Sequence, residues 1–82
     1  MVRTLYVGNI PWATTAEDLT EAFSAHGQVI SSRVITDRET GRSRGFGFVE
    51  VSDEDADSMI AALNGTELGG RVITVNEAKS RD

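Results

Sequence analysis

The stretch that most constrains the fold is Arg44–Val51, which reads Arg-Gly-Phe-Gly-Phe-Val-Glu-Val and has the pattern of a strand. Side chains alternate between the two faces of a strand. One face therefore carries Gly47, Val49 and Val51, and the other carries Arg44, Phe46, Phe48 and Glu50. The first set suits a buried core. Arginine and glutamate are seldom fully buried without a partner, so we expect the ring-bearing face to be open to solvent.

A second strand pattern, Thr4–Asn9, has the same two-sided character. Alternation places Leu5 and Val7 inward and Thr4, Tyr6 and Gly8 outward. The open side then holds Tyr6, Phe46 and Phe48, which are three of the five aromatic residues in the chain. Two helical patterns can cover only one face of a small sheet. A bare face with rings, glycines and an arginine suits stacking on flat ligands such as unpaired bases.

Turn residues and periodicity predict the order strand, helix, strand, strand, helix, strand. The expected elements are a strand over Thr4–Asn9, a helix capped by Thr14 or Thr15 and closed by His26-Gly27, strands over Val29–Asp37 and Arg44–Val51, a helix capped by Ser52 and stopped by Asn64-Gly65, and a strand over Arg71–Glu77. In the strand over Val29–Asp37 we expect Ile30 and Val34 to face the core, and Arg33 and Ile35 to share the open face. Right-handed crossovers then give two split βαβ units with both helices on one side of the sheet.

Arg44–Val51 resembles the octamer of the RNA recognition motif family, which runs basic, glycine, aromatic, glycine or alanine, aromatic, aliphatic, any residue, aromatic. Leu5–Ile10 is similar to the companion hexamer, at the separation that the family shows. Val51 departs from the pattern, which usually has an aromatic residue there, but this position faces the core and leaves the stacking face intact. The resemblance covers nearly the whole chain. It is greatest to small single-motif bacterial proteins and to plant glycine-rich RNA-binding proteins.

The resemblance implies an α+β fold, a ferredoxin-like βαββαβ sandwich whose four-stranded antiparallel sheet has the strand order 4-1-3-2 with two helices on one face. Residues 1–78 would form the RNA recognition motif domain, and residues 79–82 a short polar C-terminal tail. Tyr6 and Phe48 would each carry a base, and Phe46 would lie against the sugars. Asn76 and Lys79 match the stretch that in family members often touches bases beyond the last strand.

The candidate RNA-binding residues are Tyr6, Gly8, Arg33, Ile35, Arg42, Arg44, Phe46, Phe48, Asn76 and Lys79. At Gly8 the missing side chain would leave room for a base beside Tyr6. Arg44 suits a phosphate contact, although pairing with Glu50 or a loop acid competes with that role. Asn9 is expected to be a hydrogen-bonding residue at a strand end. For Trp12 a lid over the core is favoured over an additional stacking surface.

The formal net charge of −5 opposes nucleic-acid binding at first sight, because phosphate affinity comes largely from lysine and arginine. The distribution of charge changes this conclusion. The two helical stretches contain no basic residue and carry seven acids, Glu17, Asp18, Glu21, Asp53, Glu54, Asp55 and Asp57. The segment between them carries Arg33, Arg38, Arg42 and Arg44. We therefore expect a negative back and a more positive sheet edge.

Several classes of function are excluded. Without cysteine the chain has neither a disulfide framework nor a thiolate metal site, and His26, its one histidine, cannot build a zinc site by itself. We expect no metal and no cofactor. Gly41–Gly47 looks like a phosphate-binding loop but lacks the Gly-Lys-Ser/Thr ending and enters a strand. No catalytic constellation is evident, so we expect no enzyme. The longest apolar run, Met59–Leu63, is too short to span a membrane. A cytoplasmic location is the default, with a nucleus or organelle as the eukaryotic alternative.

The leading function is a single-stranded RNA-binding module, a monomer that stacks unpaired bases on its open sheet face. Single-stranded DNA is the alternative ligand. The alternative function is a protein-interaction domain of the same fold that binds a peptide on its helix face. Relatives of that kind carry an arginine, any residue, phenylalanine motif before the last strand, whereas this chain reads Arg71-Val72-Ile73. RNA binding is therefore favoured.

Overall fold

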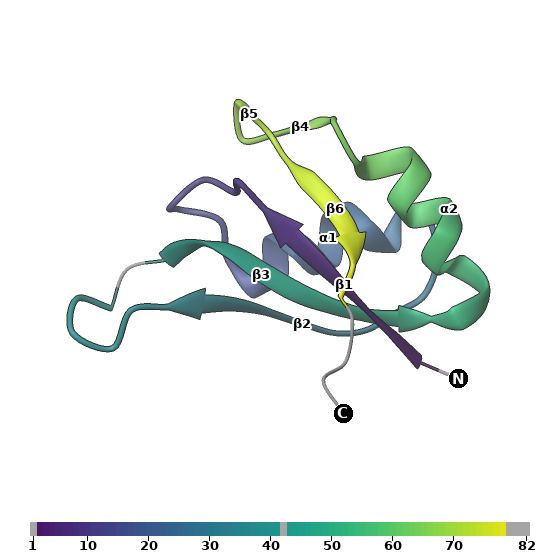
Figure 1. Ribbon diagram of the computed structural model, residues 1–82, viewed down its shortest axis with the longest axis horizontal. Coiled ribbons are helices and arrows are strands. Elements are labelled where there is room, and N and C mark those ends of the chain that lie inside the picture. The colour runs from purple at the N-terminus through teal and green to yellow at the C-terminus, as the bar shows by residue number, and fades with distance from the viewer. Residues whose placement is uncertain (1, 42, 79–82) are drawn as a thin grey trace.

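A computed structural model describes residues 2–41 and 43–78 of the chain, with the backbone alone for Ser43 and Arg44. Arg42, Lys79 and the rest of the predicted tail lie outside the described residues. Figure 1 shows the elements: β1 (Val2–Gly8), α1 (Ala16–Ser24), β2 (Val29–Thr36), β3 (Ser43–Ser52), α2 (Asp53–Leu63), β4 (Glu67–Leu68), β5 (Arg71–Val72) and β6 (Thr74–Glu77).

The main sheet has four antiparallel strands in the order β2-β3-β1-β6. With β6 as the fourth main strand this is the predicted order 4-1-3-2, and the predicted fold class is confirmed. The two short strands β4 and β5 form a separate hairpin that the sequence reading did not anticipate.

The predicted strand Arg71–Glu77 is not continuous, because it breaks at Ile73. The Ile73 N–H donates to the Thr66 carbonyl at 2.9 Å, and the Ile73 carbonyl accepts from the Gly65 N–H at 2.9 Å. Ile73 is therefore paired with the link that follows α2, while its side chain is buried in the core.

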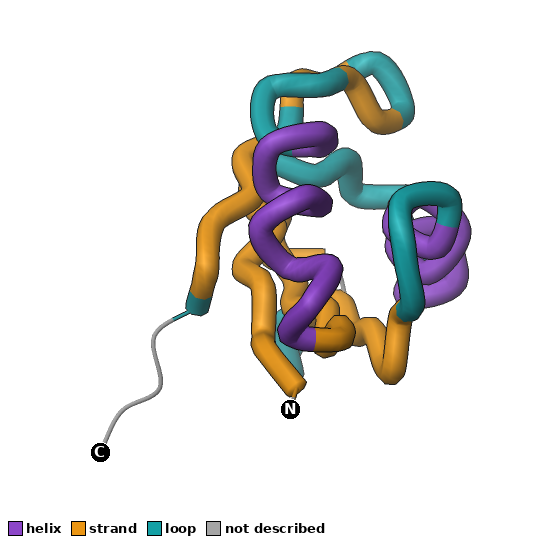
Figure 2. Tube along the Cα trace, turned by 90° about the vertical axis from the view of Figure 1, so that its right-hand side faces the viewer, coloured by secondary structure: helices purple, strands orange, loops and turns teal. Residues whose placement is uncertain are grey.

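Both helices lie on one side of the main sheet, and no element of the described chain covers the other side (Figure 2). The core lies between the helices and the sheet. Its fully buried side chains include Leu5 and Val7 of β1, Val49 and Val51 of β3, Leu19 and Phe23 of α1, and Ala56 and Met59 of α2. For the described side chains, the inward and outward faces predicted for β1 and β3 are confirmed.

The start of α1 is fixed by a capping box, which selects Thr15 over Thr14 as its cap. The Asp18 N–H donates to Thr15 Oγ1 at 3.2 Å, and the Thr15 N–H donates to Asp18 Oδ2 at 3.0 Å. Ser52 occupies the cap position of α2, but its side chain makes no capping hydrogen bond.

The predicted inward face of β2 is wrong at Ile30, which is 49% exposed, whereas Val29 packs against the core. The pairing of β2 with β3 shifts register between Val29 and Ser31 and again between Val34 and Thr36. Such irregularities reverse the alternation of side chains locally. Val34 does pack against the core, as expected.

Candidate nucleic-acid interface

The central row of the open face runs across all four main strands. In the strand register Tyr6 lies opposite Asn76 on one side and Phe48 on the other, and Phe48 lies opposite Arg33. Directly opposed residues point to the same side of a sheet. The predicted candidates Asn76, Tyr6, Phe48 and Arg33 are thus brought into one line.

Phe46 belongs to the next row, where it lies opposite Gly8, and completes a cluster of three rings. The ring centroids of Tyr6 and Phe46 are 5.8 Å apart, and Phe48 lies 6.0 Å from each of them. The Phe46 and Phe48 rings meet edge to face, with an interplanar angle of 87°. Because the rings are half-buried against one another, each keeps a surface open to solvent while its position is restrained.

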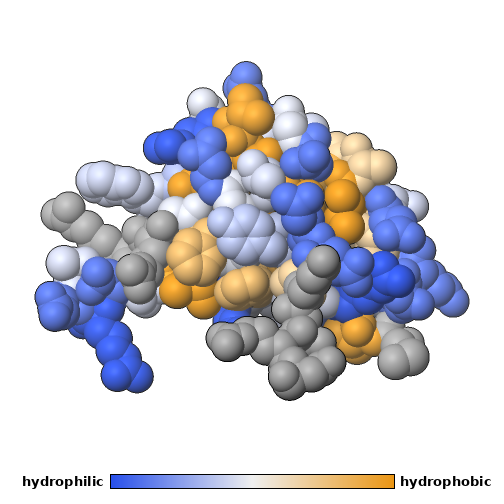
Figure 3. Space-filling model, in the orientation of Figure 1, coloured by the Kyte–Doolittle hydropathy of each residue, from blue (hydrophilic) through white to orange (hydrophobic). Residues whose placement is uncertain are grey.

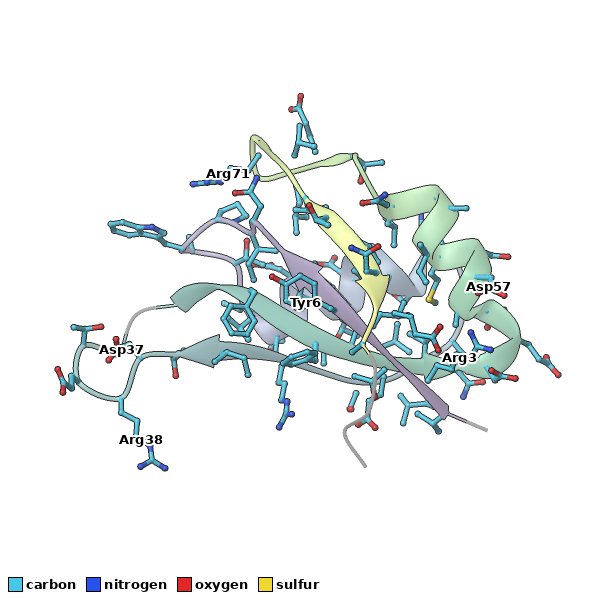
Figure 4. The ribbon with its side chains drawn as sticks, viewed as in Figure 1. Arg3, Tyr6, Asp37, Arg38, Asp57 and Arg71 are labelled. Carbon is cyan, nitrogen blue, oxygen red and sulfur yellow. The ribbon has the colours of Figure 1, made fainter. Side chains whose placement is uncertain are left out.

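In the space-filling view, the centre of this surface shows pale blue and pale orange residues of intermediate hydropathy, and strongly hydrophilic residues lie to its left and right (Figure 3). Tyr6 lies in the middle of the sheet, and its ring is turned toward the viewer (Figure 4). The predicted placement of the three rings on an uncovered face is confirmed.

Two glycines allow close packing within the sheet. A Cβ on Gly47 would overlap the Arg33 carbonyl oxygen, so Gly47 allows β2 to approach β3. A Cβ on Gly8 would lie 2.7 Å from the Tyr6 hydroxyl oxygen. The expected free space for a base beside Tyr6 at Gly8 is therefore wrong in this structure, because the Tyr6 ring itself occupies it.

The described arginines on β2 and in the loop after it differ in their position relative to the ring cluster. Arg33 Cζ lies 5.6 Å from the centroid of the Phe48 ring, so its charge borders the ring cluster. Ile35 is half-buried further along β2, and Arg38 points away from the sheet in the β2–β3 loop (Figure 4). The role predicted for Arg44 concerns a side chain outside the described atoms.

Arg3 is surrounded by three carboxylates on the helix side of the sheet. Its Nε lies 2.5 Å from Asp53, and its guanidinium lies within 3.5 Å of Asp57 and Glu77. The hydrogen bond to Asp53, followed by the charge of Glu77, raises the pKa of Arg3 above its ordinary value. Arg3 lies beside Asp57 in Figure 4 and ties β1 to α2 and β6.

The prediction that Asn9 is a hydrogen-bonding residue at the end of β1 is confirmed. With a positive φ of 59°, it donates from Nδ2 to the Val72 carbonyl at 2.6 Å and accepts from Arg71 at 2.8 Å through Oδ1. The β1–α1 loop is thus joined to β5.

Trp12 is 69% exposed, so the predicted lid over the core is wrong. The apolar side chain that is buried at that end of β1 is Ile10, which is 1% exposed.

A third row of the open face was missed as a possible site. Thr4, Glu50 and Ser31 lie opposite one another on β1, β3 and β2. The Ser31 hydroxyl donates to Glu50 Oε1 at 2.6 Å, which identifies a partner for Glu50 other than the Arg44 considered from the sequence. The alternation of β3 already placed Glu50 outward, but Ser31 could be added only after the β2 register was known.

The charge segregation agrees with expectation. All seven helical acids lie on α1 or α2, and Arg33 and Arg38 lie on the edge strand β2 and the loop after it. Within residues 2–41 and 43–78 no group of His, Asp and Glu side chains is arranged to hold a metal ion. Neither described helix has the length and apolar character required to cross a bilayer.

Known proteins of similar sequence include RNA-binding proteins from plants. The chain is 60% identical over 77 residues to glycine-rich RNA-binding protein 8 of Arabidopsis thaliana, an alignment that covers 93% of this chain and 46% of that protein. It is 54% identical over 78 residues to the chloroplastic 28 kDa ribonucleoprotein of Spinacia oleracea, covering 94% of this chain and 34% of the other. The chain thus spans about half or less of the length of these relatives.

Solved structures with the same fold include RNA binding protein PG1, at 49% identity and a TM-score of 0.90, with 98% of each chain covered. The Rna15 RRM with bound RNA (GU) superimposes with a TM-score of 0.83 at 34% identity, covering 98% of this chain and 86% of that one. A model of the RNA recognition motif family matches residues 5–74. The chain therefore belongs to the RNA recognition motif family.

Proposed function

We propose that this chain is a single-stranded RNA-binding module that stacks bases on the open face of its sheet. The observation that carries the proposal is the cluster of Tyr6, Phe46 and Phe48, with centroids 5.8 to 6.0 Å apart on a face that no described element covers. Tyr6 and Phe48 would each carry a base and Phe46 would lie against sugars. Arg44 would hold a phosphate. The RNA-bound Rna15 domain supports the proposal.

The free energy of base stacking predicts a modest affinity for single-stranded RNA. Base stacking on aromatic side chains contributes about 1–3 kcal/mol per base, and ordering a flexible strand offsets part of this. Two or three stacked bases therefore give a dissociation constant of roughly micromolar for this domain. The net charge of −5 should keep nonspecific attraction to the phosphate backbone low.

The partner is proposed to be single-stranded RNA, bound by a monomer, with single-stranded DNA as a competing ligand to be measured. The relatives named above are RNA-binding proteins or ribonucleoproteins and not enzymes, in agreement with the expectation of a non-enzymatic protein. Two relatives, from Spinacia oleracea and Arabidopsis thaliana, are chloroplastic, so similar sequences occur in an organelle. The cytoplasmic location, the domain over 1–78 and the tail stay predictions.

The test is a titration of fluorescently labelled short RNAs with the wild-type chain and with Phe46→Ala and Phe48→Ala. Each substitution should weaken binding about tenfold or more, since each removes a stacking or sugar-packing surface. Val72→Ala is the matched control, because Val72 is an apolar side chain, 53% exposed, on β5 outside the main sheet. Unchanged binding by both phenylalanine variants, with native circular dichroism, would exclude stacking on this face.

The alternative, a peptide bound on the helix side, has one supporting observation. A depression of about 460 Å³ lies between α1 and the β4–β5 hairpin, lined by Thr14, Asp18, Glu21, Ala22, Leu68 and Gly69. Its acidic rim would suit a basic peptide. We rank this function second because the rings lie on the other face. NMR shift changes confined to α1 and Leu68 on adding such a peptide would reverse the ranking.

A further inference from the structure

A depression of about 310 Å³ lies on the open face beside the ring cluster, at the third row. Its lining residues are Thr4, Ser31, Ser32, Arg33, Phe48 and Glu50. One wall is therefore an aromatic ring, and the rim combines a carboxylate, a guanidinium and hydroxyl groups. A flat polar molecule that rests on Phe48 would direct its edge to this rim.

Glu50 is the unusual member of this set, because it places a negative charge on the surface proposed to bind a polyanion. The side chain is exposed, and in the described part of the chain it forms no ion pair. The hydrogen bond from Ser31 holds Oε1 in place at 2.6 Å. A phosphate at this position would be repelled, so an RNA strand that crosses the third row must turn a base edge toward Glu50.

We propose that the Glu50 carboxylate, oriented by Ser31, selects a guanine in the depression beside Phe48. This inference rests on the proposed function. An ionised carboxylate only accepts hydrogen bonds and can accept two in parallel. The Watson–Crick edge of guanine offers two adjacent donors, N1–H and the 2-amino group. Adenine and cytosine offer one amino donor next to an acceptor, and uracil offers one N–H between two carbonyl oxygens.

A purely structural role is the competing explanation, in which Glu50 and Ser31 only form a cross-strand pair. That role would leave base preference unchanged when Glu50 is replaced. The selective role makes the opposite prediction, because a neutral amide keeps the shape of the side chain and removes the charge that pairs with two donors.

The experiment measures dissociation constants for nonameric oligouridines that carry a single guanine moved along the strand. At the guanine position that binds tightest, inosine, adenine and cytosine are then substituted. Wild-type protein should bind the guanine oligomer about tenfold more tightly than oligouridine, the discrimination typical of one bidentate pair. Inosine, which lacks the 2-amino group, should fall between the two.

Glu50→Gln should reduce the guanine preference to about threefold or less, and Ser31→Ala should reduce it in part. Glu54→Gln is the matched control, since it removes the same charge from an exposed position on α2, on the helix side. It should leave the preference at its wild-type value. A preference retained in Glu50→Gln, or absent from the wild type, would overturn this inference while leaving base stacking in place. Failure of the wild type to bind any of these RNAs would instead overturn the proposed function.

Discussion

β1 and β3 present two adjacent apolar pairs to opposite sides of the sheet, Leu5 with Val49 and Tyr6 with Phe48. Leu5 and Val49 are 0% exposed beneath the helices, whereas Tyr6 and Phe48 are half-buried on the uncovered side. One step along the strand therefore separates residues that stabilise the fold from residues that remain free to bind. Apolar surface left open after folding can be buried later by a ligand.

The largest expected effect is on stability, from Leu5→Ala. Truncation of a fully buried leucine should lower the free energy of unfolding by about 2–5 kcal/mol, because it removes packing and leaves a cavity. Urea denaturation measures this loss. Protein that remains folded at low temperature should bind RNA with wild-type affinity. Weaker binding by that folded fraction would show that the two faces are coupled.

Tyr6→Ala should mainly reduce RNA affinity, whereas Leu5→Ala should mainly reduce stability. Loss of one stacking surface should weaken RNA binding by about 1–3 kcal/mol, or roughly fivefold to 150-fold. The free energy of unfolding should fall by less than in Leu5→Ala, since the Tyr6 ring is only half-buried. Fluorescence anisotropy and urea denaturation on the same samples provide the two numbers. A larger loss of stability than of affinity would contradict the comparison.

The two glycines allow a sharper version of the same test. Gly47→Ala should destabilise the fold by about 1–3 kcal/mol, because the new methyl group meets the β2 backbone, which cannot move without breaking the sheet. In Gly8→Ala the methyl group meets the end of the Tyr6 side chain, which can rotate away. Gly8→Ala should therefore lose RNA affinity more than stability. Equal destabilisation by both substitutions would be evidence against this distinction.

Arg33→Ala should produce a smaller loss of affinity, about 0.5–1 kcal/mol, the contribution expected of an exposed cation beside an aromatic ring. If Arg33 also contacts a phosphate, the slope of log K against log salt should become shallower by about 0.7. Titrations at several salt concentrations measure both effects. Arg38→Ala is the control, since Arg38 points away from the sheet in the β2–β3 loop.

Arg3→Gln should have the smallest effect on RNA binding. The Arg3 guanidinium is held by Asp53, Asp57 and Glu77 on the helix side, away from the rings. Its pKa is raised above the ordinary value, so the cation and its stabilising effect are present throughout the neutral range and are lost only in strong alkali. A slightly lower Tm, equal at pH 7 and pH 9, is expected with unchanged RNA affinity. Weaker RNA binding would place Arg3 in the interface.

Much of the fold could be predicted because its signals are local. Alternation in β1 and β3 placed Tyr6, Phe46 and Phe48 on one face. Helical periodicity predicted the two helices that cover the other face. The family motifs added the strand order. The roles of these rings in RNA binding stay predictions, but their position is confirmed.

The predictions that proved wrong concern contacts between segments that are distant in sequence. Ile30 faces outward because β2 shifts register against β3, and the last strand breaks at Ile73 because of its pairing with Gly65 and Thr66. Trp12 is exposed, and the buried apolar residue at that end of β1 is Ile10. Gly8 offers no space beside Tyr6 because the ring folds over it.

By itself, the sequence determined which residues alternate and how many helices could cover a sheet, because both follow from backbone geometry and side-chain chemistry within a few residues. Only the tertiary structure decided that Thr4, Glu50 and Ser31 form one row beside Phe48. Their alignment depends on the register between three strands, which hydrogen bonds across the sheet set and no local pattern encodes.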